Sequence, residues 1–120
     1  MTLYAALTYT RDVDWSAPEQ AAEMVEYKQF GTDHGAAVRG GEVLYPTGTA
    51  TTVRVRGARG GEVVTTDGPY AETKEALTGF YLIEADDLDE AIRIAAEMPA
   101  AWGGAVELRP VIRRWAERQS

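Results

Sequence analysis

The alternation of apolar and polar side chains changes its period along the chain, and these changes predict the secondary structure. Residues 2–9 carry apolar groups on both sides of a two-residue period, which is typical of a central strand partly buried on both faces. Ser16 and Glu19 have the spacing of a capping box, so we expect a helix from about Ala17 into the high thirties. Its apolar stripe steps by three or four residues: Met24, Tyr27, Phe30, His34 and Val38.

The middle of the chain is rich in glycine and in β-branched residues. Gly40 and Gly41 are expected to end the first helix, and residues 42–49 to form a short strand or an extended connection. Residues 51–56 and 62–66 alternate on either side of a glycine-rich turn, which predicts a β-hairpin. This turn lacks the glycine spacing and the following helix of a phosphate-binding loop.

The last third of the chain predicts a strand, a helix and a strand. Residues 78–84 form an apolar strand, and Asp87 with Glu90 caps a helix that Pro99 should stop. The expected inward face of this helix has residues three or four apart: Leu88, Ala91, Ile92, Ala95 and Met98. Residues 105–109 complete the order as the last strand.

This order of elements matches the split βαβ pattern of an α+β, ferredoxin-like fold with an inserted β-hairpin. Two helices can cover one face of such a sheet. The other face should carry Ala105, Glu107 and Arg109 together with Tyr4 or Leu3, a mixture of apolar and charged groups. We therefore expect a second copy of the chain to cover this face in a homodimer.

Composition narrows the class of protein. The chain has 120 residues, 45% of them hydrophobic, which suits one domain over residues 1–120 with a short helical extension at 112–120. The absence of cysteine removes disulfides, thiolate metal sites and a cysteine nucleophile, and favours a cytoplasmic location. With one histidine, we expect no metal, and no cofactor motif is present. No apolar run approaches the roughly 18 residues of a membrane helix.

Charge disfavours nucleic acid as a partner. The formal net charge is -7, from 19 acidic and 12 basic residues, and a negative field repels phosphate backbones. A basic cluster near the end of the chain is the local exception, and it fits either a solvated helical turn or a contact with an acidic partner or a phosphate. Its members are Arg109, Arg113, Arg114 and Arg118, near Trp115.

Several motifs in one order resemble a known family. They occupy residues 50–55, 66–75, 77–81, 87–91 and 104–111. Together they are similar to the DGPF branch of the YCII-related domains, although Tyr70 stands where the motif of that branch has phenylalanine. The resemblance implies a dimeric α+β barrel-like fold with a site in a cleft at or near the dimer contact. It also implies relatives that use a histidine and an aspartate for proton transfer, and an extracytoplasmic-function sigma factor as a candidate partner.

His34 is the natural candidate for an acid or base, because no other residue type in the chain ordinarily titrates near neutrality. Asp33 lies about 100° around the helix from it, so Asp67 is the expected catalytic partner. Each residue also has a structural interpretation. His34 would be a packed histidine on an apolar helix face, and Asp67 would shape the turn that Gly68 and Pro69 complete.

The polar loop after Asp67 supplies the candidate ligand contacts Tyr70, Glu72 and Lys74. Arg54 and Arg109, in strands, are the candidate cations. They would form either a clamp for an anionic ligand or ion pairs at the subunit interface, with Glu72, Glu75 and Glu107 as mates.

Two classes of function remain open. In one, a cleft near the dimer contact binds a small polar or anionic molecule, and His34 with Asp67 moves protons. In the other, the protein is a non-catalytic binding or regulatory module, working with a sigma factor.

Overall fold

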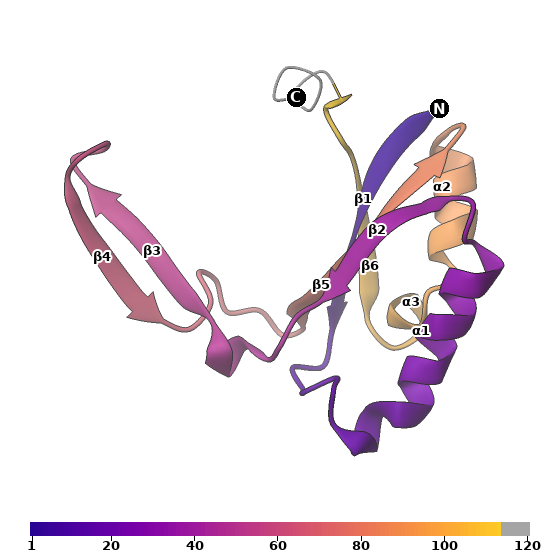
Figure 1. The fold of residues 1–120 in the computed structure, drawn as a ribbon, viewed down its shortest axis with the longest axis horizontal. Helices are drawn as coiled ribbons and strands as arrows, with labels where there is room; N and C mark the ends of the chain where they lie inside the picture. The colour runs from indigo at the N-terminus through magenta and orange to yellow at the C-terminus, as the bar shows by residue number, and fades with distance from the viewer. Residues whose placement is uncertain (114–120) are drawn as a thin grey trace.

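The computed structural model describes residues 1–113 (Figure 1). Strands and helices follow each other as expected for an α+β chain. Their bounds are β1 (Thr2–Thr10), the 3-10 turn η1 (Pro18–Gln20), α1 (Ala21–Asp33), β2 (Val38–Val43), the 3-10 turn η2 (Thr47–Thr49), β3 (Thr51–Arg56), β4 (Glu62–Asp67), β5 (Ala76–Ala85), α2 (Leu88–Ala95), α3 (Pro99–Gly103) and β6 (Ala105–Pro110). Most of the expected tail helix lies outside the described residues, as do Arg114, Trp115 and Arg118 of the basic cluster.

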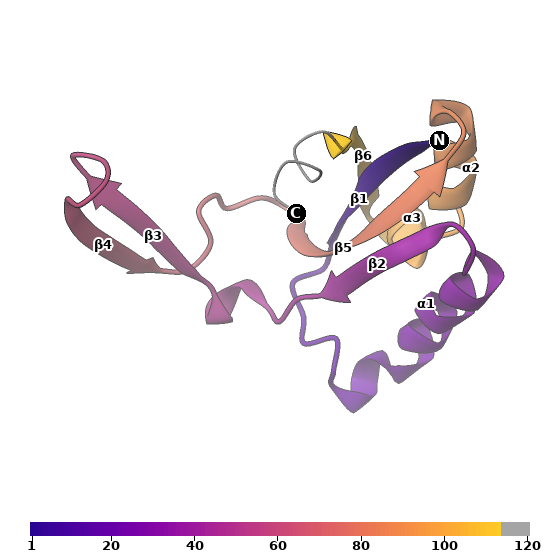
Figure 2. The ribbon, with the colours of Figure 1, turned by 45° about the horizontal axis from the view of Figure 1, so that its top comes forward.

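Four of the strands form one antiparallel sheet in the order β2-β5-β1-β6. The prediction that the first strand is central is confirmed, because β1 pairs with β5 on one side and β6 on the other. Its even-numbered residues from Tyr4 to Thr10 are buried and most of its odd-numbered ones are partly buried. The helices lie together on one side of this sheet (Figures 1 and 2), which gives the ferredoxin-like α+β arrangement.

The hydrophobic core fills the space between the sheet and the helices. Ile83 of β5 and Met98, just after α2, are the largest fully buried side chains. Phe30 of α1 packs against Tyr81 with ring centroids 5.2 Å apart. The cap predicted for α2 is confirmed, since Asp87 Oδ1 accepts a hydrogen bond from the backbone N–H of Glu90 at 2.9 Å.

The opposite side of the sheet, which we call the second face, is covered by no helix of residues 1–113. Cross-strand register places its apolar residues side by side: Leu3, Ala5, Leu7, Phe80 and Leu82, all partly exposed. Ala105, Glu107 and Arg109 follow on β6, where Arg109 lies opposite Ala5 and Glu107 opposite Leu7. The sequence offered Tyr4 or Leu3 for this face. Tyr4 is 6% exposed and belongs to the core, so Leu3 is the one that lies on the second face.

β3 and β4 pair with each other as an antiparallel hairpin with Val55 opposite Val63. The turn between them has left-handed backbone at Gly57, Ala58 and Gly60, with φ of 75°, 66° and 85°. We call residues 51–67 the arm, because the hairpin extends away from the four-stranded sheet on the side opposite the helices (Figures 1 and 2). The radius of gyration is 16.4 Å, against about 14 Å for a compact domain of this length.

The expected first helix is wrong at both ends. Its start has no capping box: Asp14 Oδ1 instead accepts from the N–H and hydroxyl of Ser16, and η1 precedes α1. Its end comes at Asp33, because the following residues pair with β5 as β2. Gly40 and Gly41 therefore lie within a strand and do not end a helix.

The second helix also differs from the expected one. Pro99 opens the short helix α3, after α2 has already ended at Ala95. Ala91, Ala95 and Met98 face the core as expected, but Leu88 and Ile92 are about half exposed. Ile94, at 8% exposure, is the buried residue that the three-or-four spacing missed.

Candidate functional site

A cavity of about 280 Å³ lies between α1 and the sheet. Its walls come from β1, the segment before η1, α1, β2 and β5, including Thr8, Trp15, Met24, Tyr27, Thr78 and Tyr81. This volume falls at the lower end of small-molecule sites, which span about 300 to 1,000 Å³. The position is therefore the best candidate for a ligand site in the described part of the chain.

Trp15 forms a buried wall of the cavity, at 5% exposure. Its ring lies edge-on to Tyr27, with centroids 6.1 Å apart, and the Arg11 guanidinium stands 5.5 Å from the ring centroid. Its indole Nε1 is buried and has no hydrogen-bond partner among residues 1–113. A buried donor without an acceptor costs about 1 to 3 kcal/mol, so this N–H calls for an acceptor from water or a ligand.

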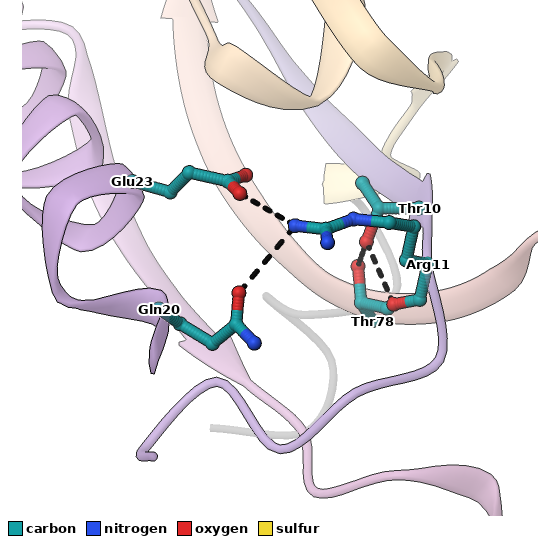
Figure 3. Close-up of polar contacts among 5 residues, drawn as sticks. All are labelled: Thr10, Arg11, Gln20, Glu23 and Thr78. Carbon is teal, nitrogen blue, oxygen red and sulfur yellow. Dashed lines mark hydrogen bonds and ion pairs between the residues drawn. The ribbon is translucent and has the colours of Figure 1, made fainter. Parts of the chain in front are cut away.

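Three threonine hydroxyls meet beside the cavity. Thr10 Oγ1 donates to Thr78 Oγ1 at 2.9 Å (Figure 3), and Thr78 Oγ1 lies 3.3 Å from Thr8 Oγ1. A β-bulge in the pairing of β1 with β5, between Thr8 and Tyr9, makes this meeting possible, since Thr78 has no direct partner in the register. Thr8 and Thr78 line the cavity and supply hydroxyls that can donate or accept.

Arg11 links the segment that contains Trp15 to the start of α1 through polar contacts. Its guanidinium reaches Glu23 Oε1 at 2.5 Å and Gln20 Oε1 at 3.4 Å (Figure 3). The positive charge is thus matched by a carboxylate. The described lining of the cavity includes no lysine, arginine or histidine and one carboxylate, that of Glu42, so it offers an anion no opposite charge.

The tyrosines of the cavity remain protonated at all ordinary pH values. Burial raises the pKa of Tyr27 to about 12, with smaller contributions from Tyr81 and Glu23. Burial also raises the pKa of Tyr81. An environment that penalises a phenolate penalises other anions too, so the cavity suits a neutral molecule with a largely apolar body.

The structure does not bring the two candidate catalytic residues together within one chain. His34 follows the end of α1, where its ring lies 5.0 Å from that of Phe30 and its Nε2 is 2.6 Å from Glu97 Oε2. Asp67 ends β4 in the arm, on the opposite side of the sheet from α1 (Figure 1). The carboxylate that contacts His34 is therefore that of Glu97.

The candidate ligand contacts are also divided between distant places. Arg54 of the arm stands 5.0 Å from the ring centroid of Tyr70, a cation–π contact. Tyr70 is 76% exposed, and Glu72 and Lys74 follow it in an exposed segment. Arg109 lies on the second face.

The expected ion pairs of these two arginines are not formed within the described chain. Among residues 1–113 neither Arg54 nor Arg109 contacts a carboxylate. Glu84, near the end of the inner strand β5, is paired with Arg113 at 2.8 Å and Arg39 at 3.4 Å. The hydrogen bond from Arg113 lowers the pKa of Glu84.

Sequence reasoning missed Trp15 and Thr78, the residues that characterise the cavity. The one sequence signal for Trp15 is its position in a polar segment, between Asp14 and Ser16. Gly79, a glycine inside an apolar strand, is the signal that could have indicated the bulge beside Thr78.

No group of three or more histidine or acidic side chains in residues 1–113 is placed to hold a metal ion. Within the same residues no helix is both long and apolar enough to cross a bilayer.

Two similarities to known sequences cover nearly the whole chain. The profile of the YCII-related domain matches residues 2–116. An uncharacterised protein of Rhizobium meliloti (strain 1021) is 38% identical over 116 residues, a stretch that covers 91% of each chain.

Proposed function

Since the chain belongs to the YCII-related domain family, we propose that it is a homodimeric protein whose cavity between α1 and the sheet binds a small neutral molecule. The observation that carries the proposal is the buried Nε1 of Trp15, which has no acceptor among residues 1–113. The ligand supplies that acceptor, as a carbonyl or amide oxygen.

The chemistry of the walls selects this class of ligand. Trp15, Met24 and Tyr27 provide apolar and aromatic surface, and Thr78 adds a hydroxyl close to it. The volume suits a molecule of about one ring and not a nucleotide. The sequence suggested a polar or anionic ligand, but a lining with no cation and with the carboxylate of Glu42 disfavours an anion, and its largely apolar walls favour a neutral molecule.

The homodimer rests on the second face. Leu3, Leu7, Phe80 and Leu82 form a continuous apolar strip across β1 and β5. A strip of this kind on a sheet is ordinarily buried against another surface, and a second copy offers the same strip by two-fold symmetry.

A second candidate function is acid–base chemistry at His34, and the contact with Glu97 favours it. A carboxylate oxygen 2.6 Å from Nε2 fixes the orientation of the imidazole ring. The pair suggested by the sequence, His34 with Asp67, would need the arm of a second copy, because α1, which His34 follows, and β4, which Asp67 ends, lie on opposite sides of the sheet (Figure 1).

Calorimetry with two matched probes tests the binding proposal. Benzamide and benzoate have the same ring, but only the amide is neutral. We expect benzamide to bind more tightly, Trp15→Phe to abolish binding, and Trp102→Phe to leave it unchanged, because Trp102 Nε1 already donates to Ala96 O at 2.8 Å. Equal binding of benzoate, or full binding by Trp15→Phe, contradicts the proposal. Native mass spectrometry of the purified protein would then identify any molecule that accompanies it.

A further inference from the structure

We infer that the arm is an assembly element, whose three-valine face packs against a second copy of this chain. The inference rests on the homodimer proposed above and adds a contact that the second face alone does not provide. The face consists of Val53, Val55 and Val63, which are 60%, 44% and 64% exposed in the single chain.

Register places the three valines on one side of the hairpin. Val55 lies directly opposite Val63, and Val53 is two residues before Val55 on the same strand. Side chains two residues apart on a strand, and those directly opposite across a pair, point to the same side. The valines thus form one apolar patch.

A hairpin with such a patch needs a surface to pack on. Two strands alone are marginally stable in water, and they gain stability when one side is buried against a third element. Among the described residues, β3 and β4 pair with each other and with no strand of the larger sheet. Hydrogen bonds across its base, from Gly68 N to Ala50 O and from Thr52 Oγ1 to Gly68 O, extend the pairing of the hairpin with itself.

The position of the arm indicates where the second copy lies. The arm and the four-stranded sheet diverge from a common base, with the helices on the outer side of the sheet (Figures 1 and 2). A copy docked on the second face therefore occupies the side of the sheet toward which the arm extends. Two-fold symmetry then lets each arm reach the other copy, so that both apolar surfaces are buried at once.

Charge supports a copy of this chain as the occupant. The arm contains Arg54, Arg56 and Arg59 against Glu62 and Asp67, which makes it net positive by one. The rest of the chain carries -8. Arg54 and Arg56 alternate with the valines and lie on the other side of the hairpin, so the net charges attract the arm and the body over long range and do not pair across the valine contact.

Sedimentation equilibrium of the Val55→Thr/Val63→Thr variant tests the inference. Threonine keeps the β-branched shape and the strand preference, so the change removes apolar surface without a strong effect on the hairpin. We expect the dimer dissociation constant to rise about tenfold or more. Val25→Thr is the matched control, because Val25 lies on α1 and is 65% exposed, almost the same as Val63. It should leave the constant unchanged.

Site-specific crosslinking gives an independent readout, since the chain has no native cysteine. Val63→Cys labelled with a maleimide–benzophenone should yield covalent dimers on illumination, and labelled Val25→Cys should not. Hydrogen exchange of the arm amides should become faster on dilution below the dissociation constant.

The outcomes separate the two proposals. A wild-type protein that sediments as a monomer at all concentrations overturns both the homodimer and the role of the arm. A wild-type dimer that the threonine variant does not weaken, and whose arm label forms no covalent dimer, overturns the role of the arm alone. Slow hydrogen exchange of the arm amides in the dissociated monomer would also overturn the role of the arm alone.

Discussion

The imidazole of His34 and the carboxylate of Glu97 join two helices that are far apart in sequence. His34 follows the last turn of α1, and Glu97 lies in the turn after α2, with 2.6 Å between Nε2 and Oε2. The His34 side chain is 21% exposed and that of Glu97 62%, so the pair closes the edge of the core beside Phe30.

Nuclear magnetic resonance of the His34 ring can identify its partner. Glu97→Gln should shift the ring resonances at neutral pH, because it removes the charge that faces Nε2. Asp67→Asn is the control and should leave them in place in the monomeric chain. The stability lost in Glu97→Gln should stay below about 1 kcal/mol, as for other exposed pairs. A shift in the Asp67 variant instead would place the arm of a second copy beside His34.

Gly41→Ala should destabilise the protein by about 1 to 3 kcal/mol in urea unfolding. A Cβ at this position would come within 2.6 Å of the Phe80 carbonyl oxygen and 3.0 Å of Tyr81 Cδ1. The neighbouring Gly40→Ala is the matched control, since its Cβ would meet Leu82 Cδ1 at 3.9 Å, an ordinary contact. A loss in Gly41→Ala no larger than in Gly40→Ala would show that the close approach of β2 to β5 does not set the effect, because the lower chain entropy of alanine favours folding in both variants.

Thr78→Val should cost about 1 kcal/mol, because it removes the 2.9 Å acceptor of the buried Thr10 hydroxyl and leaves that donor only the longer contact of 3.3 Å with Arg11 O. Thr66→Val, on the exposed side of the arm, serves as the control and should change the free energy of unfolding little. Urea denaturation measures both. An unchanged stability in Thr78→Val would mean that the Thr10 hydroxyl turns to Arg11 O at no cost.

The protein should lose stability at alkaline pH through its cavity tyrosines. Burial raises the pKa of Tyr27 from 10.0 to about 12, so the folded state binds its proton more tightly than the unfolded state. The resulting stability is complete below pH 10 and is lost as the pH rises through 12. Thermal unfolding of the wild type and Tyr27→Phe over this range should show a smaller alkaline loss in the variant. Tyr45→Phe, at a ring 67% exposed, should behave as the wild type.

The sequence predicted the elements whose signals are local. Strand alternation in β1, the glycine-rich turn of the arm and the cap at Asp87 each depend on neighbours within a few residues, and each is found. The end of α1 is different, since residues 38–43 pair with β5, about 40 positions later. That pairing outweighs the local apolar stripe that continued the helix to Val38.

The cavity depends on contacts that no local pattern records. Arg11 must reach Glu23 to hold Trp15 over α1, and the bulge at Thr8 must turn the hydroxyl of Thr78 toward Thr10. The charged and polar residues that the sequence selected were recognised by type. The structure distributes them over the arm, the second face and the edge of the core, because residue type does not determine position in three dimensions.

The connection between β2 and β5 has a consequence for engineering. These strands are antiparallel neighbours, the chain leaves the sheet at Val43, and Leu44 N still donates to Thr78 O at 2.8 Å. Antiparallel neighbours can be joined by a turn of about two residues. Residues 44–75 are therefore an enlarged turn, and a tight turn or a foreign hairpin can replace them with no change in strand order. New recognition loops can therefore be grafted between β2 and β5 while the four-stranded sheet and its helices are kept.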